Sequence, residues 1–143
     1  MLFVPAATLA GLTPKDVEVR FYDDRMELIP FDEPTDLVAM TVETYTARRS
    51  YQIANEYRER GVKVVMGGYH PTFLPGECQQ YADAVVQGDA EGIWGRVVAD
   101  ARAGRLEPRY EQAEFATLDG TRMDRSIYDG KRYVPVTLVQ YGR

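Results

Sequence analysis

A chain of 143 residues that is 45% hydrophobic and 27% charged is long enough for one domain with a buried core, but not for two. Its formal charge of −5 at pH 7 argues against a nucleic-acid partner, because proteins bind phosphate backbones with basic surfaces. The single cysteine, Cys78, excludes an intrachain disulfide and a thiolate metal site, and with no signal segment and no apolar stretch near the roughly 20 residues of a membrane span, we expect a cytoplasmic location.

Short β-rich runs alternate with helical patterns from the start of the chain. A helical segment at 2–12 ends before Thr13-Pro14, and a β-rich run follows at 17–21. Residues 37–42 form a nearly continuous apolar run, which suits a strand buried on both faces. A helix is predicted over 45–60, where apolar residues recur every three or four positions and Gly61 follows as the stop.

The alternation continues through the middle of the chain. A second nearly continuous apolar run covers 62–66, and a short helix is predicted around 75–81. The run at 84–86 precedes a helix whose start Asp89 can cap and which ends at Gly104. Strands that alternate with helices every 20–25 residues or so predict an α/β fold, namely a Rossmann-like or flavodoxin-like open parallel sheet with helices on both faces.

The pattern breaks at both ends of the chain. Residues 105–132 are polar and irregular, and 133–141 then reads as a strand. Open sheets of this kind begin with a strand, whereas this sequence begins with a predicted helix, so we expect the first strand to be lacking and a place beside 37–42 to be vacant. The segment 133–141, or its copy in a second molecule, is a candidate for that place, as a strand swap or a homodimer. We therefore divide the chain into an α/β domain at 1–106 and a linker with a terminal strand at 107–143.

Two of the loops after predicted strands carry residues suited to a ligand, at the end of the sheet where open parallel sheets bind ligands. After 37–42, Thr44 and Thr46 place hydroxyls at the start of a helix. After 62–66, Gly67 and Gly68 remove two side chains, so that a flat ring can lie against the backbone. The only histidine, His70, follows two residues later.

The loop after 84–86 completes the set. Gly88 removes a third side chain, and free amides near Asp89 and Glu91 are suited to a polar tail. Together the three loops predict a groove for a large flat ligand. Each feature also has a simpler interpretation: the glycine pair as a tight turn, the threonines as helix caps, and His70 as an ordinary loop histidine.

The sequence lacks the residues that several other functional classes require. Asp23-Asp24 is typical of a phosphate-accepting receiver domain, but no aspartate ends 37–42 and no lysine follows a later strand. There is no Walker A or GxGxxG pattern, and one histidine with one cysteine gives no convincing nucleophile–base pair. We therefore expect no catalytic residue and no metal ligand in this chain.

Six blocks of sequence occur in a familiar order between about residues 12 and 106. They are Asp36–Val42, Thr44-Tyr45-Thr46-Ala47, Gly67-Gly68-x-His70-x-Thr72, Leu74-Pro75, Ala82-Asp83-Ala84-Val85-Val86 and Gly88-x-Ala90-Glu91. In this order they resemble the N-terminal cobalamin-binding-type domain of B12-dependent radical SAM enzymes. The likeness is strongest to the branch that contains the anaerobic magnesium-protoporphyrin IX monomethyl ester oxidative cyclase.

The resemblance implies a cofactor and a larger parent. Cobalamin would contact a set of loop residues: Thr44, Tyr45, Thr46, Gly67, Gly68, His70, Gly88 and Glu91. In the family, a strand like 133–141 leads into the cysteines that hold a [4Fe–4S] cluster and S-adenosylmethionine in a radical SAM barrel. Those cysteines are absent here, so we expect a fragment that is not catalytic alone and whose partner is that barrel. The parent is a cyclase or a methyltransferase, with its substrate left open.

One departure from the wider family leaves two alternatives. The motif Asp-x-His-x-x-Gly, whose histidine binds cobalt from below, does not occur in this chain. The resemblance then implies cobalamin bound without a protein histidine ligand, or a docking or dimerisation module of the same fold that no longer binds cobalamin. A flavodoxin-like FMN binder is a third interpretation from the fold alone, although no phosphate-cradling loop follows a first strand.

Overall fold

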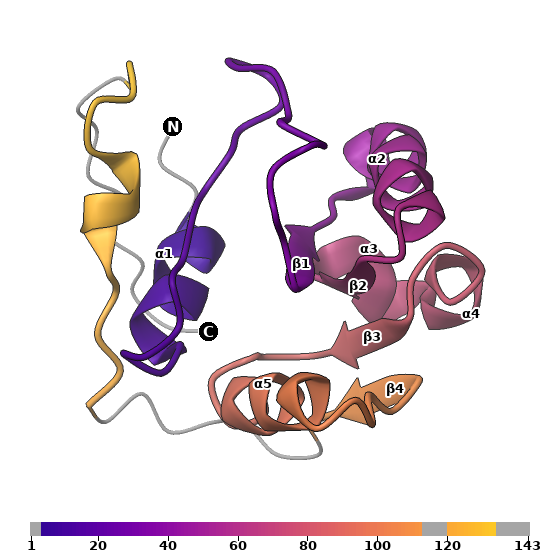
Figure 1. Ribbon diagram of the computed structural model, residues 1–143. Helices are drawn as coiled ribbons and strands as arrows, with labels where there is room; N and C mark the ends of the chain where they lie inside the picture. The colour runs from indigo at the N-terminus through magenta and orange to yellow at the C-terminus, as the bar shows by residue number, and fades with distance from the viewer. Residues whose placement is uncertain (1–3, 113–119, 134–143) are drawn as a thin grey trace.

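The computed structural model describes residues 4–112 and 120–133, and its centre is a sheet of four parallel strands (Figure 1). The strands are β1 (Leu37–Thr41), β2 (Lys63–Gly67), β3 (Ala84–Gln87) and β4 (Arg109–Glu111), in the spatial order β1-β2-β3-β4. The helices are α1 (Val4–Leu12), α2 (Ala47–Glu59), α3 (Tyr69–Phe73), α4 (Pro75–Cys78) and α5 (Trp94–Arg102), with 3₁₀ turns η1 (Thr44–Thr46) and η2 (Arg125–Tyr128). The predicted α/β fold is confirmed.

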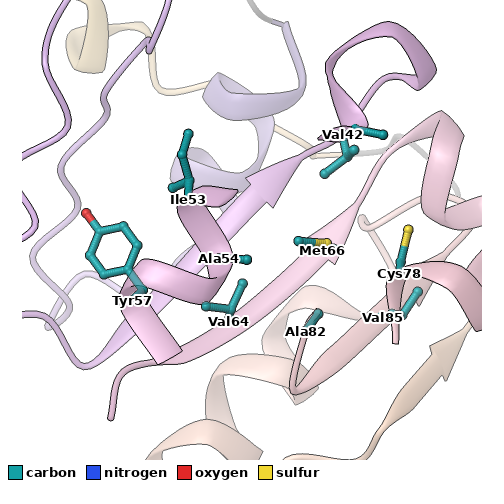
Figure 2. Close-up of a cluster of buried hydrophobic side chains, with 10 residues drawn as sticks. Val42, Ile53, Ala54, Tyr57, Val64, Met66, Cys78, Ala82 and Val85 are labelled. Carbon is teal, nitrogen blue, oxygen red and sulfur yellow. The ribbon is translucent and has the colours of Figure 1, made fainter. Parts of the chain in front are cut away.

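Helices cover both faces of the sheet because its strands are apolar on both faces. On one face, Val64 and Met66 of β2 belong to one cluster of buried side chains with Ile53 and Ala54 of α2, which Figure 2 shows. On the other face, Val65 packs in a second cluster whose buried members from α5 are Trp94, Val97 and Val98. These buried side chains follow from the nearly continuous apolar runs in the sequence, since β1, β2 and β3 each contribute to both cores.

The connections between the parallel strands all begin at the same edge of the sheet. Gly61, with φ of +79°, ends α2 as predicted, and the N–H of Val62 donates to the carbonyl of Tyr57 at 3.0 Å. The chain then enters β2, and Met40 of β1 lies opposite Met66. Because the strands are parallel, the loops that follow β1, β2 and β3 all leave at the carboxyl edge of the sheet.

The predicted strand at 17–21 is wrong. These residues join no ladder in the described part of the chain, where β1 pairs with β2 alone. Val17 instead packs against the second core, and Arg20 at the surface pairs with Glu18 and Glu33. A β-rich run becomes a strand only beside a strand with which it can exchange backbone hydrogen bonds.

The sequence also misplaced some boundaries and missed two elements. The helix expected to start near Asp89 begins at Trp94, with Ile93 as its N-cap, and the helix expected over 75–81 ends at Cys78. Helix α3 and strand β4 were not predicted; β4 has three residues, of which Tyr110 alone is buried. Apart from Tyr133, the terminal strand predicted at 133–141 lies outside the described residues. In the described ranges, no helix has the length and apolar character to cross a membrane.

Candidate functional site

Backbone hydrogen bonds hold the first two loops together at the carboxyl edge of the sheet. The N–H of Val42, just after β1, donates to the carbonyl of Gly67 at 2.8 Å. The N–H of His70, in the first turn of α3, donates back to the carbonyl of Val42 at 3.1 Å. The end of β1 is therefore fixed against the glycine pair, and the predicted residues of these two loops come together in space.

Gly68 has a conformational role that differs from the expected one. Its φ of +104° and ψ of −168° lie in a region that only glycine populates readily, and a Cβ there would lie 3.0 Å from the carbonyl oxygen of Val42. A Cβ on Gly67 would meet Val86 at 3.7 Å, an ordinary contact. Both Cβ directions thus face protein rather than an open slot. The sharp entry into α3 is what requires Gly68.

The two threonines of the first loop differ in their contacts. The hydroxyl of Thr46 donates to the carbonyl of Glu43 at 3.0 Å and accepts from the N–H of the same residue at 3.1 Å, so Thr46 stabilises its own turn. Thr44 is exposed, and its hydroxyl lies 3.3 Å from Nδ1 of His70. Of the two threonines, Thr44 is the more exposed residue.

His70 lies beneath the loops. Its ring is buried, with Nε2 at 2.9 Å from the hydroxyl of Tyr51 and Nδ1 facing Thr44. Tyr51 stacks on Tyr81 with ring centroids 4.0 Å apart and also donates to Glu77 at 2.8 Å. Burial, together with its hydrogen-bonded neighbours, raises the pKa of Tyr51, so its hydroxyl keeps its proton.

Thr72 joins the second and third loops, and sequence reasoning did not name it as a site residue. Its hydroxyl donates to the carbonyl of Gly68 at 2.8 Å and accepts from the N–H of Gly88 at 3.1 Å. The spacing Gly68-x-x-x-Thr72 was the available signal, because a threonine four residues into a helix reaches back to the first carbonyl. Gly88 has φ of +80°, and Glu91 follows, half-buried, in the turn before α5.

Large apolar side chains are exposed around this edge. Tyr45 in η1 is 80% exposed, and Tyr69 and Phe73 of α3 are 69% and 75% exposed. The last two lie four residues apart and therefore share one face of the helix. Grouped aromatic side chains in water mark a surface that meets a ligand or another protein segment.

A cavity of about 420 Å³ lies at the other end of the sheet. Its lining includes Arg58, Lys63 and Asp83, at the amino end of β2 and β3. Asp83 accepts hydrogen bonds there from Lys63 Nζ at 2.8 Å and from the backbone of Val64 at 3.0 Å. The cavity is open to solvent and far from the three loops, so we place the site at the loops.

The family model for the B12-binding domain matches residues 8–98. The chain belongs to the B12-binding domain family. Its matched range includes all three strand–loop units described above. The part of the cobalamin prediction that concerns the domain type is thereby confirmed.

Two relatives from Chlorobaculum tepidum resemble this B12-binding domain along most of its length. Bacteriochlorophyllide d C-8(2)-methyltransferase is 34% identical over 139 residues, which covers 90% of this chain and 31% of that protein. Bacteriochlorophyllide d C-12(1)-methyltransferase is 32% identical over 109 residues, which covers 75% of this chain and 24% of that protein. The chain therefore spans less than a third of either relative.

A solved structure supports the fold of this B12-binding domain. The N-terminal domain of a hypothetical protein from Thermotoga maritima superimposes with a TM-score of 0.51 at 22% identity. The match covers 68% of this chain and 78% of that one. At this identity the likeness concerns the fold alone.

The residues of this B12-binding domain fit a large ligand that carries amide donors and apolar surface, such as cobalamin. The side-chain oxygen of Gln87, at the end of β3, is buried and has no hydrogen-bond partner in the described part of the chain, while its nitrogen donates to the carbonyl of Thr72 at 3.2 Å. Such an acceptor beside Gly88 is available to a ligand N–H. The exposed aromatic side chains supply apolar contact.

The domain has no imidazole to offer to cobalt. His70 is the only histidine, its side chain is 5% exposed, and both ring nitrogens lie within hydrogen-bond distance of protein groups. In the ranges 4–112 and 120–133, no three histidine, cysteine, aspartate or glutamate side chains form a group that could hold a metal ion. Cobalamin would therefore be held here by contacts to its ring edge and tail.

Proposed function

We propose that the domain binds cobalamin across the loops after β1, β2 and β3, and that it is the cofactor module of a larger methyltransferase of the radical SAM type. The observation that supports this most is the convergence of these three loops, cross-linked by Thr72 and the His70 network, in a member of the B12-binding family. The names of the two relatives favour methyl transfer over the oxidative cyclisation that the sequence left open.

The contribution of this chain to such an enzyme is binding and orientation. Cobalamin supplies a cobalt centre that carries a methyl group or takes part in redox steps. Tyr45, Tyr69 and Phe73 offer apolar area to the ring, whereas Thr44 and Gln87 offer hydrogen-bonding groups to its edge. We assign the [4Fe–4S] cluster and S-adenosylmethionine to a barrel elsewhere in the parent protein.

Retention of hydroxocobalamin tests the binding part of the proposal. The purified chain is mixed with hydroxocobalamin and desalted, and its visible spectrum is recorded, with FMN as a parallel ligand. We expect retained corrinoid absorbance and no retained FMN. Because the aromatic pair of α3 provides apolar contact, the double variant Tyr69→Ser/Phe73→Ser should lose the corrinoid. The matched control is Leu28→Ser, since Leu28 is 93% exposed and lies outside the three loops.

The outcomes separate the alternatives. Failure of both the chain and its parent protein to retain corrinoid would favour the docking or dimerisation module. Retention that Tyr69→Ser/Phe73→Ser leaves intact would place the corrinoid away from α3. The radical SAM part of the proposal is tested by the sequence of the parent protein. We expect three cysteines in a CxxxCxxC spacing soon after the residue that corresponds to 143 here, and a parent protein without them would refute this part.

A further inference from the structure

Four side chains form a continuous hydrogen-bonded row from the surface of α4 to the ligand edge of the sheet. Glu77, which is 47% exposed, accepts from the hydroxyl of Tyr51 at 2.8 Å. The oxygen of Tyr51 lies 2.9 Å from Nε2 of His70, and Nδ1 of the same ring lies 3.3 Å from the hydroxyl of Thr44. The row therefore connects the carboxylate of Glu77 in α4 to the hydroxyl of Thr44, an exposed residue of the first loop.

The direction of every hydrogen bond in the row follows from its carboxylate end. An ionised carboxylate only accepts, so Tyr51 donates its single proton to Glu77. The oxygen of Tyr51 must then accept from His70, and this places the proton of a neutral imidazole on Nε2. Nδ1 is left as an acceptor, so the hydroxyl of Thr44 donates to it.

Neighbouring groups favour the same direction. Burial raises the pKa of the Cys78 thiol, whose sulfur lies 3.6 Å from the oxygen of Tyr51, so the thiol keeps a proton to offer to that oxygen. The raised pKa of Tyr51 likewise keeps its phenol protonated and able to donate. The protonated phenol gives its single proton to Glu77, which leaves a lone pair of its oxygen for Nε2–H.

We infer that Glu77, Tyr51 and His70 are positioning residues: they fix the hydrogen bond in which Thr44 donates its hydroxyl proton to Nδ1 of His70. The hydroxyl of Thr44 can then only accept a hydrogen bond from a ligand. The consequence is a preference for ligands that donate at this point. On the proposed function, on which this step rests, the donor is an N–H of a side-chain carboxamide at the edge of the corrin ring. A ligand carboxylate in the same place would also be only an acceptor, so it would face the lone pairs of Thr44 without a hydrogen bond, and its binding is disfavoured.

The tautomer of His70 tests the polarity without any ligand. Because the chain has one histidine, ¹⁵N-histidine labelling gives a single imidazole signal set that needs no assignment. At about pH 8, where an imidazole is normally neutral, long-range ¹H–¹⁵N spectra should show a protonated Nε2 and an unprotonated Nδ1. A protonated Nδ1 in the wild-type chain would overturn the inference, whether or not the chain binds corrinoid.

Glu77→Gln keeps the shape of the side chain but no longer fixes the direction of the hydrogen bonds in the row. A carboxamide both donates and accepts, so Tyr51 is no longer forced to donate outward, and the Nδ1–H tautomer of His70 becomes allowed. We expect this second tautomer to appear in the spectra of Glu77→Gln. An unchanged tautomer in this variant would show that Glu77 does not set the polarity, and would refute that step.

Ligand preference is measured as the ratio of two dissociation constants. The probes are dicyanocobinamide, which carries carboxamides, and dicyanocobyrinic acid, which carries carboxylates. We expect Thr44→Val to weaken cobinamide binding by roughly threefold to tenfold, the loss typical of one hydrogen bond, to leave the acid nearly unaffected, and Thr44→Ser to restore the ratio. Glu77→Gln should lower the preference for the amide more than Glu43→Gln, which removes a nearby charge without touching the row.

These measurements distinguish the two proposals. If the wild-type chain binds neither probe, the proposed function fails, while the tautomer still decides the direction of the row. If the chain binds both probes but Thr44→Val leaves the ratio of dissociation constants unchanged, the proposed function stands and the inference about Thr44 is refuted.

Discussion

The hydroxyl of Thr72 in α3 accepts a hydrogen bond from the N–H of Gly88 at 3.1 Å, although the two residues follow different strands, β2 and β3. The same hydroxyl donates to the carbonyl of Gly68 at 2.8 Å. The side chain of Thr72 therefore links the glycine turn after β2 to the glycine turn after β3 and sets the distance between them. A ligand that lies across both turns meets an edge whose width Thr72 sets.

Thr72→Val should loosen this edge without removing volume. Valine keeps the shape of threonine but neither donates nor accepts, so the N–H of Gly88 loses its partner. We expect the free energy of unfolding to fall by about 1 kcal/mol, amide exchange of Gly88 to accelerate, and hydroxocobalamin retention to weaken. Urea unfolding and hydrogen exchange check the first two results. Thr72→Ser, which keeps the hydroxyl, is the control, and equal behaviour of the two variants would contradict the assigned role.

Most of the sheet could be predicted from the sequence because its strands are buried on both faces. The runs at 37–42, 62–66 and 84–86 have few polar residues, and each became a strand within a residue or two of the expected bounds. The positions of the three loops followed from this, since parallel strands end at one edge. The presence of the site residues at that edge was thus accessible from pattern alone.

The remainder depends on contacts that no local pattern encodes. The run at 17–21 has strand-like composition but no strand beside it in the described part of the chain. Tyr110 of β4 is buried in the second core, where its hydroxyl donates to Asp100 at 3.0 Å. The burial of His70 follows from Tyr51, nineteen residues earlier in the sequence. Likewise, the need for glycine at position 68 comes in part from Val42, which follows β1.

Gly68 and Gly67 should respond differently to alanine. At Gly68 the backbone has φ of +104°, so Gly68→Ala should lower the free energy of unfolding by about 1–3 kcal/mol, the usual cost of such a conformation for a residue with a side chain. At Gly67 the new methyl group would make ordinary contacts at 3.7 Å and 3.8 Å, so Gly67→Ala should leave stability almost unchanged. Chemical denaturation compares the two. A larger loss for Gly67→Ala would show that the turn is not the reason for the glycine pair.

Asp23 should make the protein sensitive to acid. The Arg25 guanidinium and, to a smaller extent, the hydroxyl of Tyr133 donate hydrogen bonds to the carboxylate of Asp23. They lower its pKa to about 2, although burial acts to raise it. A carboxyl group whose pKa is depressed by folding stabilises the fold above its unfolded pKa, near 3.8, and loses that contribution as the pH falls through about 2. The partly exposed arginine limits the contribution to about 1–2 kcal/mol.

The measurement for Asp23 is urea unfolding of wild type and Asp23→Asn between about pH 6 and pH 2, the range that spans the two pKa values. The difference in free energy of unfolding should be largest at the upper end and should shrink as the pH approaches 2, because a protonated aspartic acid resembles asparagine. Asp32→Asn is the control, since the side chain of Asp32 is fully exposed. A difference that stays constant with pH would rule out the titration of Asp23 as its cause.

Gly11 and Gly95 offer a matched pair of glycines in helices. Gly11 lies where α1 meets the segment 120–133, and a Cβ there would be 1.7 Å from the carbonyl oxygen of Arg122, whereas a Cβ on Gly95 of α5 meets nothing within 4 Å. In a helix, alanine is favoured over glycine by about 1 kcal/mol. Gly95→Ala should therefore stabilise the protein, as thermal or urea unfolding would show.

Gly11→Ala should have the opposite effect, because the new methyl group cannot fit while the main chain of Arg122 stays against α1. The N–H of Asp124 donates to the carbonyl of Ala7 at 2.9 Å, so this hydrogen bond should break as the segment moves away. Amide exchange at Asp124 should accelerate although the helix content rises or stays constant. If Gly11→Ala were as stabilising as Gly95→Ala, the contact between α1 and the segment 120–133 would not contribute to the fold in solution.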